Sequence, residues 1–414
     1  MMEENKMKKM LATLLTVCML LSLAVFTGAA AETTETTIEF WHGMSSGLQT
    51  ALVALTDKFN EENDMGITVN LTNQGGYTDL STKLLGAIAS DTLPDMSQVY
   101  NSYIASSLDV VVPLDDFIAN DFDNYEDILS GYRAEGAEFG PIYTIAFNKS
   151  VQIYYYNKDL YEELGLTPPT TWQELYDVSK AIYEATGNAA FGYDDLFGMF
   201  LQYMLQNGAG YVEDGQVVFN NEKGVEAMTF LLDLFSLGYA RTAGEDRYLS
   251  GPFNNGLIAA YIGSSAGAAY VNPVDFEYGA SIIPVGEYPA AMQAGTNLAM
   301  FTQDATKQAA VWEYIKFLTS TESTVYWAMN TGYLPIRESG FESEDYQAFM
   351  ETSAVAQAAY EQADNQAFEY AFPGSQEMRT ALGTAMETAI LEGWTAEETI
   401  DYMAEAAQEI LDRQ

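Results

Sequence analysis

The segment FWHGM at residues 40–44 decides the expected fold, because a strand ends in it and a helix begins directly after it. β-Branched residues precede this segment, and leucines recur at helical spacing from Ser45 onward. A second β-branched strand lies at residues 67–71. A GGY turn at residues 75–77 then leads into another helical stretch and the segment PDMSQVY at residues 94–100. Strands and helices that alternate in this way predict βαβ units on a mostly parallel sheet.

The first 31 residues have the composition of a secretory signal peptide. Lysines precede an apolar stretch from Met10 to Phe26, and small residues follow up to Ala31, where we expect cleavage. The mature protein is therefore expected to be secreted and extracytoplasmic, either periplasmic or associated with the cell surface. Cys18 is the only cysteine and lies inside the apolar stretch, so the sequence predicts no lipid anchor at the cleavage site. An uncleaved anchor is the alternative.

The chain is strongly acidic, with 59 acidic residues against 17 lysines and arginines and a formal net charge of −42. A surface of this sign repels phosphate backbones and anionic membranes, so the sequence predicts no binding to nucleic acid. A hydrophobic fraction of 48% excludes a disordered acidic chain. Roughly 380 residues remain after cleavage, which exceeds the usual size of one hydrophobic core and predicts two lobes.

The chain is expected to pass between the two lobes more than once. Crossings are predicted near residues 144–150 and 286–295, so each lobe would be built from separate parts of the chain. The predicted lobes are residues 32–146 plus 292–336, and residues 147–291 plus 337–414. Strands that connect two lobes form a hinge, and a hinge permits closure around a ligand in the cleft.

Capping boxes, in which a threonine is followed three residues later by a glutamate, predict where helices begin. They are Thr171 with Glu174, Thr319 with Glu322, and Thr395 with Glu398. The first of these helices is expected to end at Gly187. Residues 238–256 are expected to be loop-like, whereas residues 276–285 and 295–301 are predicted strands.

The segment GSSAG at residues 263–267 matches the G-x-S-x-G pattern of serine hydrolases. That mechanism needs a histidine after the serine, and the only histidine of the chain, His42, lies far upstream. The segment is instead interpreted as a turn before a helix, either simply packed or able to hold an anion or hydroxyl oxygen on its backbone N–H groups. One histidine without a useful cysteine cannot build a zinc site, so no metal and no cofactor are predicted.

The acidic residues leave a second enzymatic alternative open, because glycoside hydrolysis uses a pair of carboxylates. Nothing in the sequence places two carboxylates across one site, so a secreted glycoside or phosphodiester hydrolase remains the alternative to a binding protein. Aromatic residues make up 13% of the chain. Most of them are expected in the core, and a few could stack on the apolar faces of sugar rings.

Several short motifs resemble, in their order and spacing, the family 1 extracellular solute-binding proteins of ABC importers. These motifs are FWH at 40–42, GGYTDL at 75–80, PDMSQVYNS at 94–102, FNKS at 147–150, YYNK at 155–158, TWQEL at 171–175 and TGYLPI at 331–336. The resemblance implies an α/β, two-lobed periplasmic-binding-protein-like fold of class II type, with discontinuous lobes, a hinge and a third crossing near residues 334–342. It also implies a monomer that is not an enzyme and that delivers a small-molecule ligand to permease subunits.

Within this family the motifs are most similar to the branch that binds glycerol 3-phosphate or sugars. The ligand-binding positions that this resemblance implies are Tyr77, Asn101, Ser150, Phe197, Ser264, Gly295, Tyr333 and Arg379. Asn101 stands where the branch has a glutamate, and Phe197 stands where it has a tryptophan. Arg379 could grip a phosphate in bidentate fashion or could lie on a helix surface. A sugar and a polyol phosphate therefore both remain open as the ligand.

Overall fold

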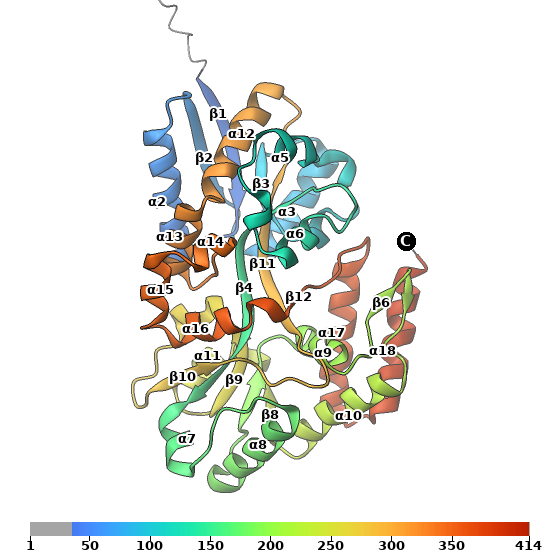
Figure 1. Cartoon of the computed structure of the whole chain (residues 1–414). Helices are drawn as coiled ribbons and strands as arrows, with labels where there is room; N and C mark the ends of the chain where they lie inside the picture. Colours follow the sequence, from blue (N-terminus) through green and yellow to red (C-terminus); the bar gives the residue numbers. More distant parts are fainter. Residues whose placement is uncertain (1–34, 414) are drawn as a thin grey trace, which may run out of the picture.

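The computed structural model describes residues 35–413, so the predicted signal peptide and its cleavage site lie outside the described residues. Two lobes lie one above the other and are joined by long strands (Figure 1). The strands of the sheet that runs through both lobes follow the order β2 (Ile67–Asn73), β1 (Thr36–His42), β3 (Met96–Val99), β11 (Ala291–Met300), β4 (Ile145–Asn157), β9 (Ala260–Ser264), β5 (Phe191–Tyr193) and β8 (Ala240–Thr242). The predicted two-lobed α/β fold is therefore confirmed.

The upper lobe contains the parallel strands that the opening segment predicts. β1 pairs in parallel with β2 along its whole length and with β3 near its end. Ile38 and Phe40 point into the core, where they are fully buried. Helix α2 (Ser46–Glu62) packs on β2, α12 (Ala305–Leu318) packs on β1, and α13 (Thr321–Thr331) packs on α2. The edge of the Tyr314 ring packs on Phe40 with a centroid distance of 5.9 Å, so α12 closes this core.

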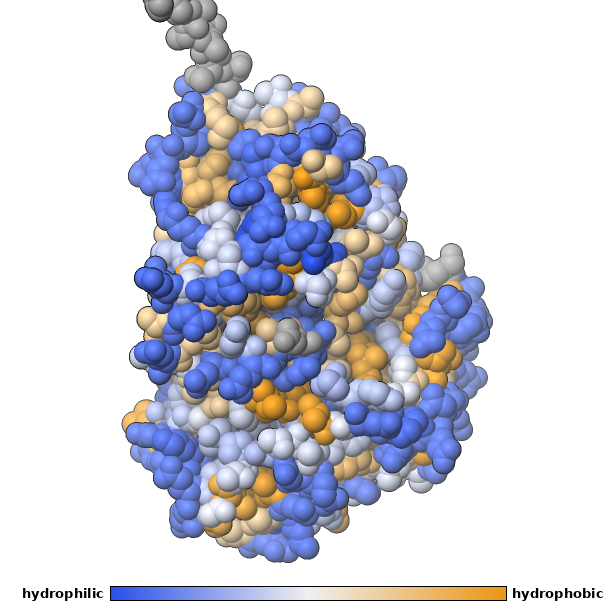
Figure 2. Space-filling view, in the orientation of Figure 1, coloured by the Kyte–Doolittle hydropathy of each residue, from blue (hydrophilic) through white to orange (hydrophobic). Residues whose placement is uncertain are grey.

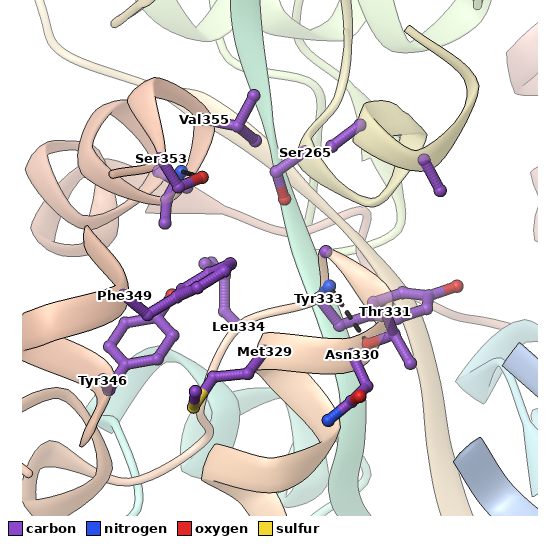
Figure 3. Close-up of a pocket in the computed structure, with 15 residues that line it drawn as sticks. Ser265, Met329, Asn330, Thr331, Tyr333, Leu334, Tyr346, Phe349, Ser353 and Val355 are labelled. Atoms are coloured by element: carbon purple, nitrogen blue, oxygen red, sulfur yellow. Dashed lines mark hydrogen bonds between the residues drawn. The ribbon is translucent and has the colours of Figure 1, made fainter. Parts of the chain in front are cut away.

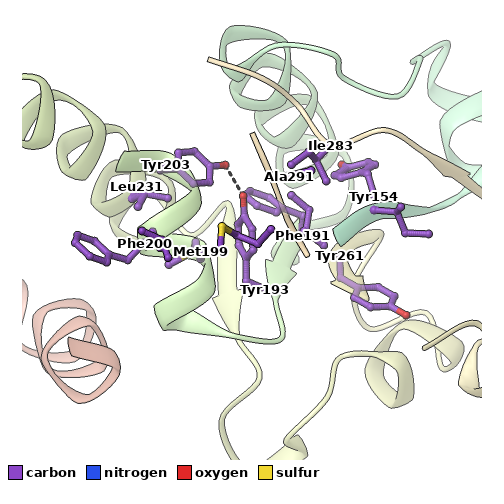
Figure 4. Packing of buried hydrophobic residues seen from close by; sticks show 14 of the residues in the cluster. Tyr154, Phe191, Tyr193, Met199, Phe200, Tyr203, Leu231, Tyr261, Ile283 and Ala291 are labelled. Atoms are coloured by element: carbon purple, nitrogen blue, oxygen red, sulfur yellow. Dashed lines mark hydrogen bonds between the residues drawn. The ribbon is translucent and has the colours of Figure 1, made fainter. Parts of the chain in front are cut away.

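The lower lobe has a core that is rich in tyrosine (Figure 4). Tyr155 and Tyr261 stack across the β4–β9 pair with ring centroids 4.7 Å apart. The hydroxyl of Tyr193 donates to the hydroxyl of Tyr203 inside the same core. Hydroxyl groups that pair with one another allow large aromatic rings to be buried without stranding a polar atom.

Two strands carry the chain between the lobes. β4 pairs with β11 along its first half and with β9 and β10 (Tyr278–Ser281) along its second half. β11 runs back from the lower lobe and pairs with β3 in the upper lobe. A third connection passes Leu334, whose backbone N–H donates to the carbonyl of Lys149 at 2.7 Å. The discontinuous lobes and the crossings follow the prediction, whereas the residue boundaries given for the lobes stay a prediction.

Helices cover the outside of both lobes. The remaining α-helices are α3 (Tyr77–Ser90), α4 (Asn101–Ile104), α5 (Asp115–Asp121), α6 (Ser130–Gly136), α7 (Lys158–Leu164), α8 (Trp172–Thr186), α9 (Leu196–Gln206), α10 (Glu222–Ser236), α11 (Ser250–Asn254), α14 (Glu338–Phe341), α15 (Glu344–Met350), α16 (Ala354–Glu361), α17 (Ser375–Glu392) and α18 (Ala396–Leu411). Hydrophilic residues cover much of the face seen in Figure 2. None of the helices within residues 35–413 combines the length and the apolar composition that a membrane crossing requires.

The capping boxes at Thr171 and Thr395 are present and start α8 and α18. The box predicted at Thr319 is wrong, because the hydroxyl of Thr319 bonds back to the Ile315 carbonyl inside α12. Ser320 caps α13 instead, since its Oγ accepts from the backbone N–H of Ser323. The loop expected at residues 238–256 also contains a short strand, β8, and a short helix, α11.

Candidate functional site

A cavity of about 410 Å³ lies between the lobes, where β4 and β11 cross from one lobe to the other. Tyr77 and Asn101 line it from the upper lobe, Arg379 lines it from the lower lobe, and Gly295 lies on the crossing strand β11. The structure thus brings together four of the predicted ligand-binding residues. The other four, Ser150, Phe197, Ser264 and Tyr333, are not among the residues that line this cavity. The volume suits a small solute.

Tyr77 begins α3 and takes part in a short chain of polar groups. Its hydroxyl lies 2.9 Å from the Tyr333 hydroxyl, and Asn148 Nδ2 donates to it at 3.0 Å. Tyr333 is only 6% exposed, and its ring stacks on Trp327 in the core of the upper lobe. Burial raises the pKa of both tyrosines, so their hydroxyls stay protonated at neutral pH. Tyr333 therefore supports the Tyr77 hydroxyl from behind.

Ser150 and Ser264 lie side by side on the paired strands β4 and β9. The Ser264 hydroxyl donates to Ser150 Oγ at 2.9 Å and accepts from the backbone N–H of Ala266 at 3.1 Å. The helix expected after the GSSAG segment is a 3-10 helix of six residues, η4 (Ser265–Tyr270), and Ser264 caps it. The backbone N–H of Ala266, at the start of η4, is therefore already bound to the Ser264 hydroxyl.

Asn101 uses its side chain within the protein. Its Nδ2 donates to the backbone carbonyl of Glu135 at 2.8 Å and to Glu138 Oε1 at 2.5 Å. Its Oδ1 accepts from Thr144 and Asn297. The residue is 4% exposed. Asn101 therefore holds the wall of the cavity together, and the structure gives it no free donor for a ligand.

A buried ion pair forms part of the floor of the cavity. Lys149, on the crossing strand β4, is completely buried, and its Nζ lies 2.6 Å from Glu135 Oε2 on α6. Gln293 Nε2, on β11, donates to the same oxygen at 2.8 Å. The ion pair thus links both crossing strands to the upper lobe. Sequence reasoning missed both residues of the pair as part of the site. Lys149 lies in the FNKS motif at 147–150 and could have been found there, whereas Glu135 lies in none of the quoted motifs.

Arg379, on α17, lies between two carboxylates. Its Nη1 donates to Glu369 Oε2 at 2.5 Å, and its Nη2 donates to Asp195 Oδ2. The guanidinium carbon lies 4.8 Å from the centre of the Phe197 ring, which supports the planar cation from one side. Burial raises the pKa of Glu369, although Arg379 opposes this shift. Arg379 lies in the cleft, so the alternative of an exposed surface arginine does not apply.

Aromatic rings line the cavity around these charges. The edge of Tyr77 packs on Tyr100 with a centroid distance of 5.6 Å, and Tyr100 packs on Tyr103 at 5.2 Å. Tyr248 and Phe368 line the cavity from the lower lobe. Tyr100 directly precedes the predicted residue Asn101 and ends the PDMSQVY segment, so its position in the motif could have identified it. No comparable signal marks Asp195 or Glu369 in so acidic a chain.

A second, smaller cavity of about 220 Å³ lies between the end of α13 and helices α15 and α16 (Figure 3). Met329, Tyr333, Phe349 and Val355 are among its lining residues, and the described lining residues carry no charge. The described residues include no group of three or more histidine, cysteine, aspartate or glutamate side chains that could hold a metal ion.

Comparisons with known proteins agree on the family. The sequence model of the bacterial extracellular solute-binding proteins matches residues 54–354. The sn-glycerol-3-phosphate-binding periplasmic protein UgpB of Pectobacterium atrosepticum is 26% identical over 406 residues, which cover 90% of each chain.

Solved structures show the same fold. The cyclic alpha-maltosyl-1,6-maltose binding protein from Arthrobacter globiformis superposes with a TM-score of 0.82 at 22% identity, over 92% of this chain and 100% of that chain. UgpB from Mycobacterium tuberculosis, in complex with glycerophosphocholine, gives a TM-score of 0.81 at 23% identity, over 92% of this chain and 99% of that chain.

Proposed function

The chain belongs to the bacterial extracellular solute-binding proteins, and we propose that it captures a carbohydrate or a glycerol-3-phosphate-like solute between its lobes and delivers it to an ABC importer. One observation carries this proposal. The cavity is lined from both lobes and lies where the crossing strands β4 and β11 meet. A rotation about these strands would enclose a solute on all sides and change the outer surface that a permease meets.

The lining of the cavity supports a small polyol as the solute. Tyrosine and phenylalanine rings provide apolar faces for the C–H groups of a sugar or polyol chain, and amide and carboxylate groups provide partners for its hydroxyls. Tyr77, Gly295 and Arg379 would contact the solute directly. Ser150, Phe197, Ser264, Tyr333 and Asn101 would hold these contact residues in place.

A panel of solutes tests the proposal by thermal shift and by calorimetric titration. We expect at least one sugar, polyol or polyol phosphate to raise the melting temperature of the purified protein and to bind with one-to-one stoichiometry. The loss of this binding in Tyr77→Ala, with the fold retained by circular dichroism, would locate the solute in the cleft. A protein that no solute of the panel stabilises would contradict the proposal.

The alternative function, a secreted glycoside or phosphodiester hydrolase, has less support. The family is one of binding proteins rather than enzymes. The carboxylates that line the cavity, Glu135, Asp195 and Glu369, are all ion-paired with lysine or arginine, which makes them poor candidates for an acid and base pair. Incubation with glycans and glycerophosphodiesters, followed by product analysis, separates the two functions, because a binding protein returns its solute unchanged.

We further propose that the mature protein acts outside the cytoplasm as a monomer, after cleavage of a signal peptide at residue 31. The proposed lobes are residues 32–146 plus 292–336 and residues 147–291 plus 337–414. The hydrophobic cluster around Phe40 lies mostly in the first proposed lobe and the cluster around Tyr261 lies mostly in the second, which supports this division. Phe147 of the first cluster and Met292, Val325, Ala328 and Leu334 of the second lie across the proposed boundaries. Light scattering of the secreted protein tests its oligomeric state, and sequencing of its N-terminus tests the cleavage site.

A further inference from the structure

The charged side chains that line the cleft cavity already compensate one another. They are the carboxylates of Glu135, Asp195 and Glu369 and the cations Lys149 and Arg379. Lys149 is paired with Glu135, and Arg379 is paired with both Asp195 and Glu369. Among the described lining residues, every cation has a carboxylate partner and one negative charge is in excess. An incoming anion therefore finds no free positive charge.

Three buried oxygen atoms of the lining, Oε1 of Gln152 among them, lack a hydrogen-bond partner in the described part of the chain. Gln293 donates through Nε2 to Glu135, which leaves its Oε1 as an acceptor, and this atom has no partner among the described residues. Glu369 binds Arg379 through Oε2, and its Oε1 is likewise buried without a partner. Amide oxygens and ionised carboxylates only accept hydrogen bonds. A solute that satisfies this wall therefore has to bring hydrogen-bond donors.

We propose that Asp195 and Glu369 are specificity-determining residues, which make this cleft reject phosphate monoesters and select hydroxyl-rich solutes without net negative charge, such as neutral sugars or amino sugars. The inference rests on the proposed function, because it concerns the solute of the same cavity. It decides between the two classes of solute that the sequence leaves open.

The chemistry of a phosphate monoester opposes this site. Such a group carries a charge between about −1.5 and −2 at neutral pH, and its oxygens are strong acceptors. To form two parallel hydrogen bonds with the Arg379 guanidinium, the phosphate group must displace Asp195 or Glu369. The displaced carboxylate then remains in the cleft without its cation. A hydroxyl group can donate to Gln293 or Glu369 and can accept from Arg379, so it adds contacts without breaking the ion pairs.

Calorimetric titration with glycerol 3-phosphate as the probe tests the inference. The wild-type protein is compared with Asp195→Asn, Glu369→Gln and the double variant. We expect weak binding of the probe to the wild type and an affinity at least about tenfold higher in the double variant, because Arg379 regains an uncompensated charge. The gain should shrink as salt is added, since part of it is a screened Coulomb attraction.

Glu377→Gln is the matched control. Glu377 lies on the same helix as Arg379, pairs with Arg413 at 2.7 Å and is exposed outside the cavity. The substitution changes the net charge by the same amount as either single cleft variant, so an effect of total charge alone would appear in it too. We expect its affinity for glycerol 3-phosphate to equal that of the wild type.

The outcomes separate this inference from the proposed function. Wild-type protein that binds glycerol 3-phosphate as tightly as the double variant overturns the inference, and so does a correctly folded double variant without any gain. If the double variant does not fold, the single variants carry the same comparison. Mass spectrometry of the solute that co-purifies adds an independent readout, because a phosphate monoester in the native protein would overturn the inference but leave the proposed function standing.

Discussion

His42 shows how one residue can be recognised in the sequence and still receive its role only from the fold. It ends β1, is 1% exposed, and its Nδ1 accepts from the backbone N–H of Met44 at 3.2 Å. Burial lowers its pKa from 6.5 to about 4. The sequence excluded His42 as a catalytic base or a zinc ligand. The structure adds that it is a neutral part of the core that closes the turn after β1.

The first prediction concerns the titration of His42. Because the chain contains a single histidine, proton NMR should show one imidazole signal that titrates near pH 4 in the folded protein and near 6.5 in urea. A base with a lowered pKa stabilises the fold above pH 6.5, and this contribution is lost as the pH falls towards 4. A folded-state midpoint above 6 would show that His42 is exposed to solvent.

The second prediction concerns Tyr333. Its ring is buried against Trp327, so Tyr333→Ala should lower the free energy of unfolding by about 3–5 kcal/mol in urea denaturation. Tyr333→Phe keeps the ring and loses the hydroxyl that pairs with Tyr77, so the expected loss is only about 0.5–1.5 kcal/mol. A stable Tyr333→Ala variant with weakened solute binding would instead assign the ring to the ligand.

At the residue scale, the sequence resemblance predicted residues of the cleft but not which of them are held by other side chains. Tyr77, Asn101, Gly295 and Arg379 all line the cavity. The hydrogen bonds of Asn101 depend on Thr144 and Asn297, which are distant in sequence. The ion pairs of Arg379 depend on Asp195, 184 residues away, and on Glu369, 10 residues away. In a chain with 59 acidic residues, no local pattern identifies the two that hold the arginine.

At the scale of elements, β11 depends on one glycine. Gly295 has a φ of +101°, and a Cβ atom at this position would lie 1.8 Å from the backbone oxygen of Asn148 on β4. The register between β11 and β4 shifts directly after it, between Thr296 and Asn297. A glycine is needed here because the backbone is left-handed and the neighbouring strand approaches closely. The sequence resemblance implies a role in binding, and the local geometry adds a structural one.

The third prediction follows from this contact. Gly295→Ala should lower the free energy of unfolding by at least about 2 kcal/mol, because it adds both backbone strain and a clash with a backbone atom. Gly86→Ala is the matched control. Gly86 lies within helix α3 with open space around its Cα, so this substitution should stabilise the protein by about 0.5–1 kcal/mol. Equal urea midpoints for both variants would contradict the proposed strain.

Helix starts show where local patterns suffice and where they fail. The boxes at Thr171 and Thr395 were predictable from the sequence. A capping box requires only a threonine, a glutamate three residues later and a helix that follows them. At residues 319–322 two helices follow one another almost without a loop, and both Thr319 and Ser320 could serve as the cap. Glu322 pairs with Lys58 of another helix instead, and only the tertiary structure provides that partner.

At the scale of the whole molecule, the sequence was enough to predict two lobes from the chain length, their α/β type from the alternation of strands and helices, and the strands that join them. It could not predict that the lobes touch at one edge of the cleft. There the backbone N–H of Ala371 donates to Glu138 Oε2 at 3.0 Å, and Gln376 Nε2 donates to Ser102 Oγ at 2.7 Å. These pairs are separated by more than two hundred residues, so they arise only from the arrangement of the finished lobes.

The last prediction is that pH shifts the balance between closed and open lobes. Burial raises the pKa of Glu138 to about 7, against the opposing effect of its hydrogen bonds from Ala371 and Asn101. Opening would return Glu138 to water, where its pKa is near 4.5. The closed form therefore binds a proton more tightly, so its advantage is complete below pH 4.5 and is lost as the pH rises through 7.

Small-angle scattering of solute-free protein should consequently give a larger radius of gyration at pH 8 than at pH 5.5. Glu138→Gln cannot ionise and should give the same radius at both values. A pH dependence that persists in this variant would assign the effect to the general charge repulsion of so acidic a chain. If the pH dependence disappears, Glu138 is the group that links protonation to the hinge, because the variant removes one ionisable carboxyl and leaves the other acids unchanged.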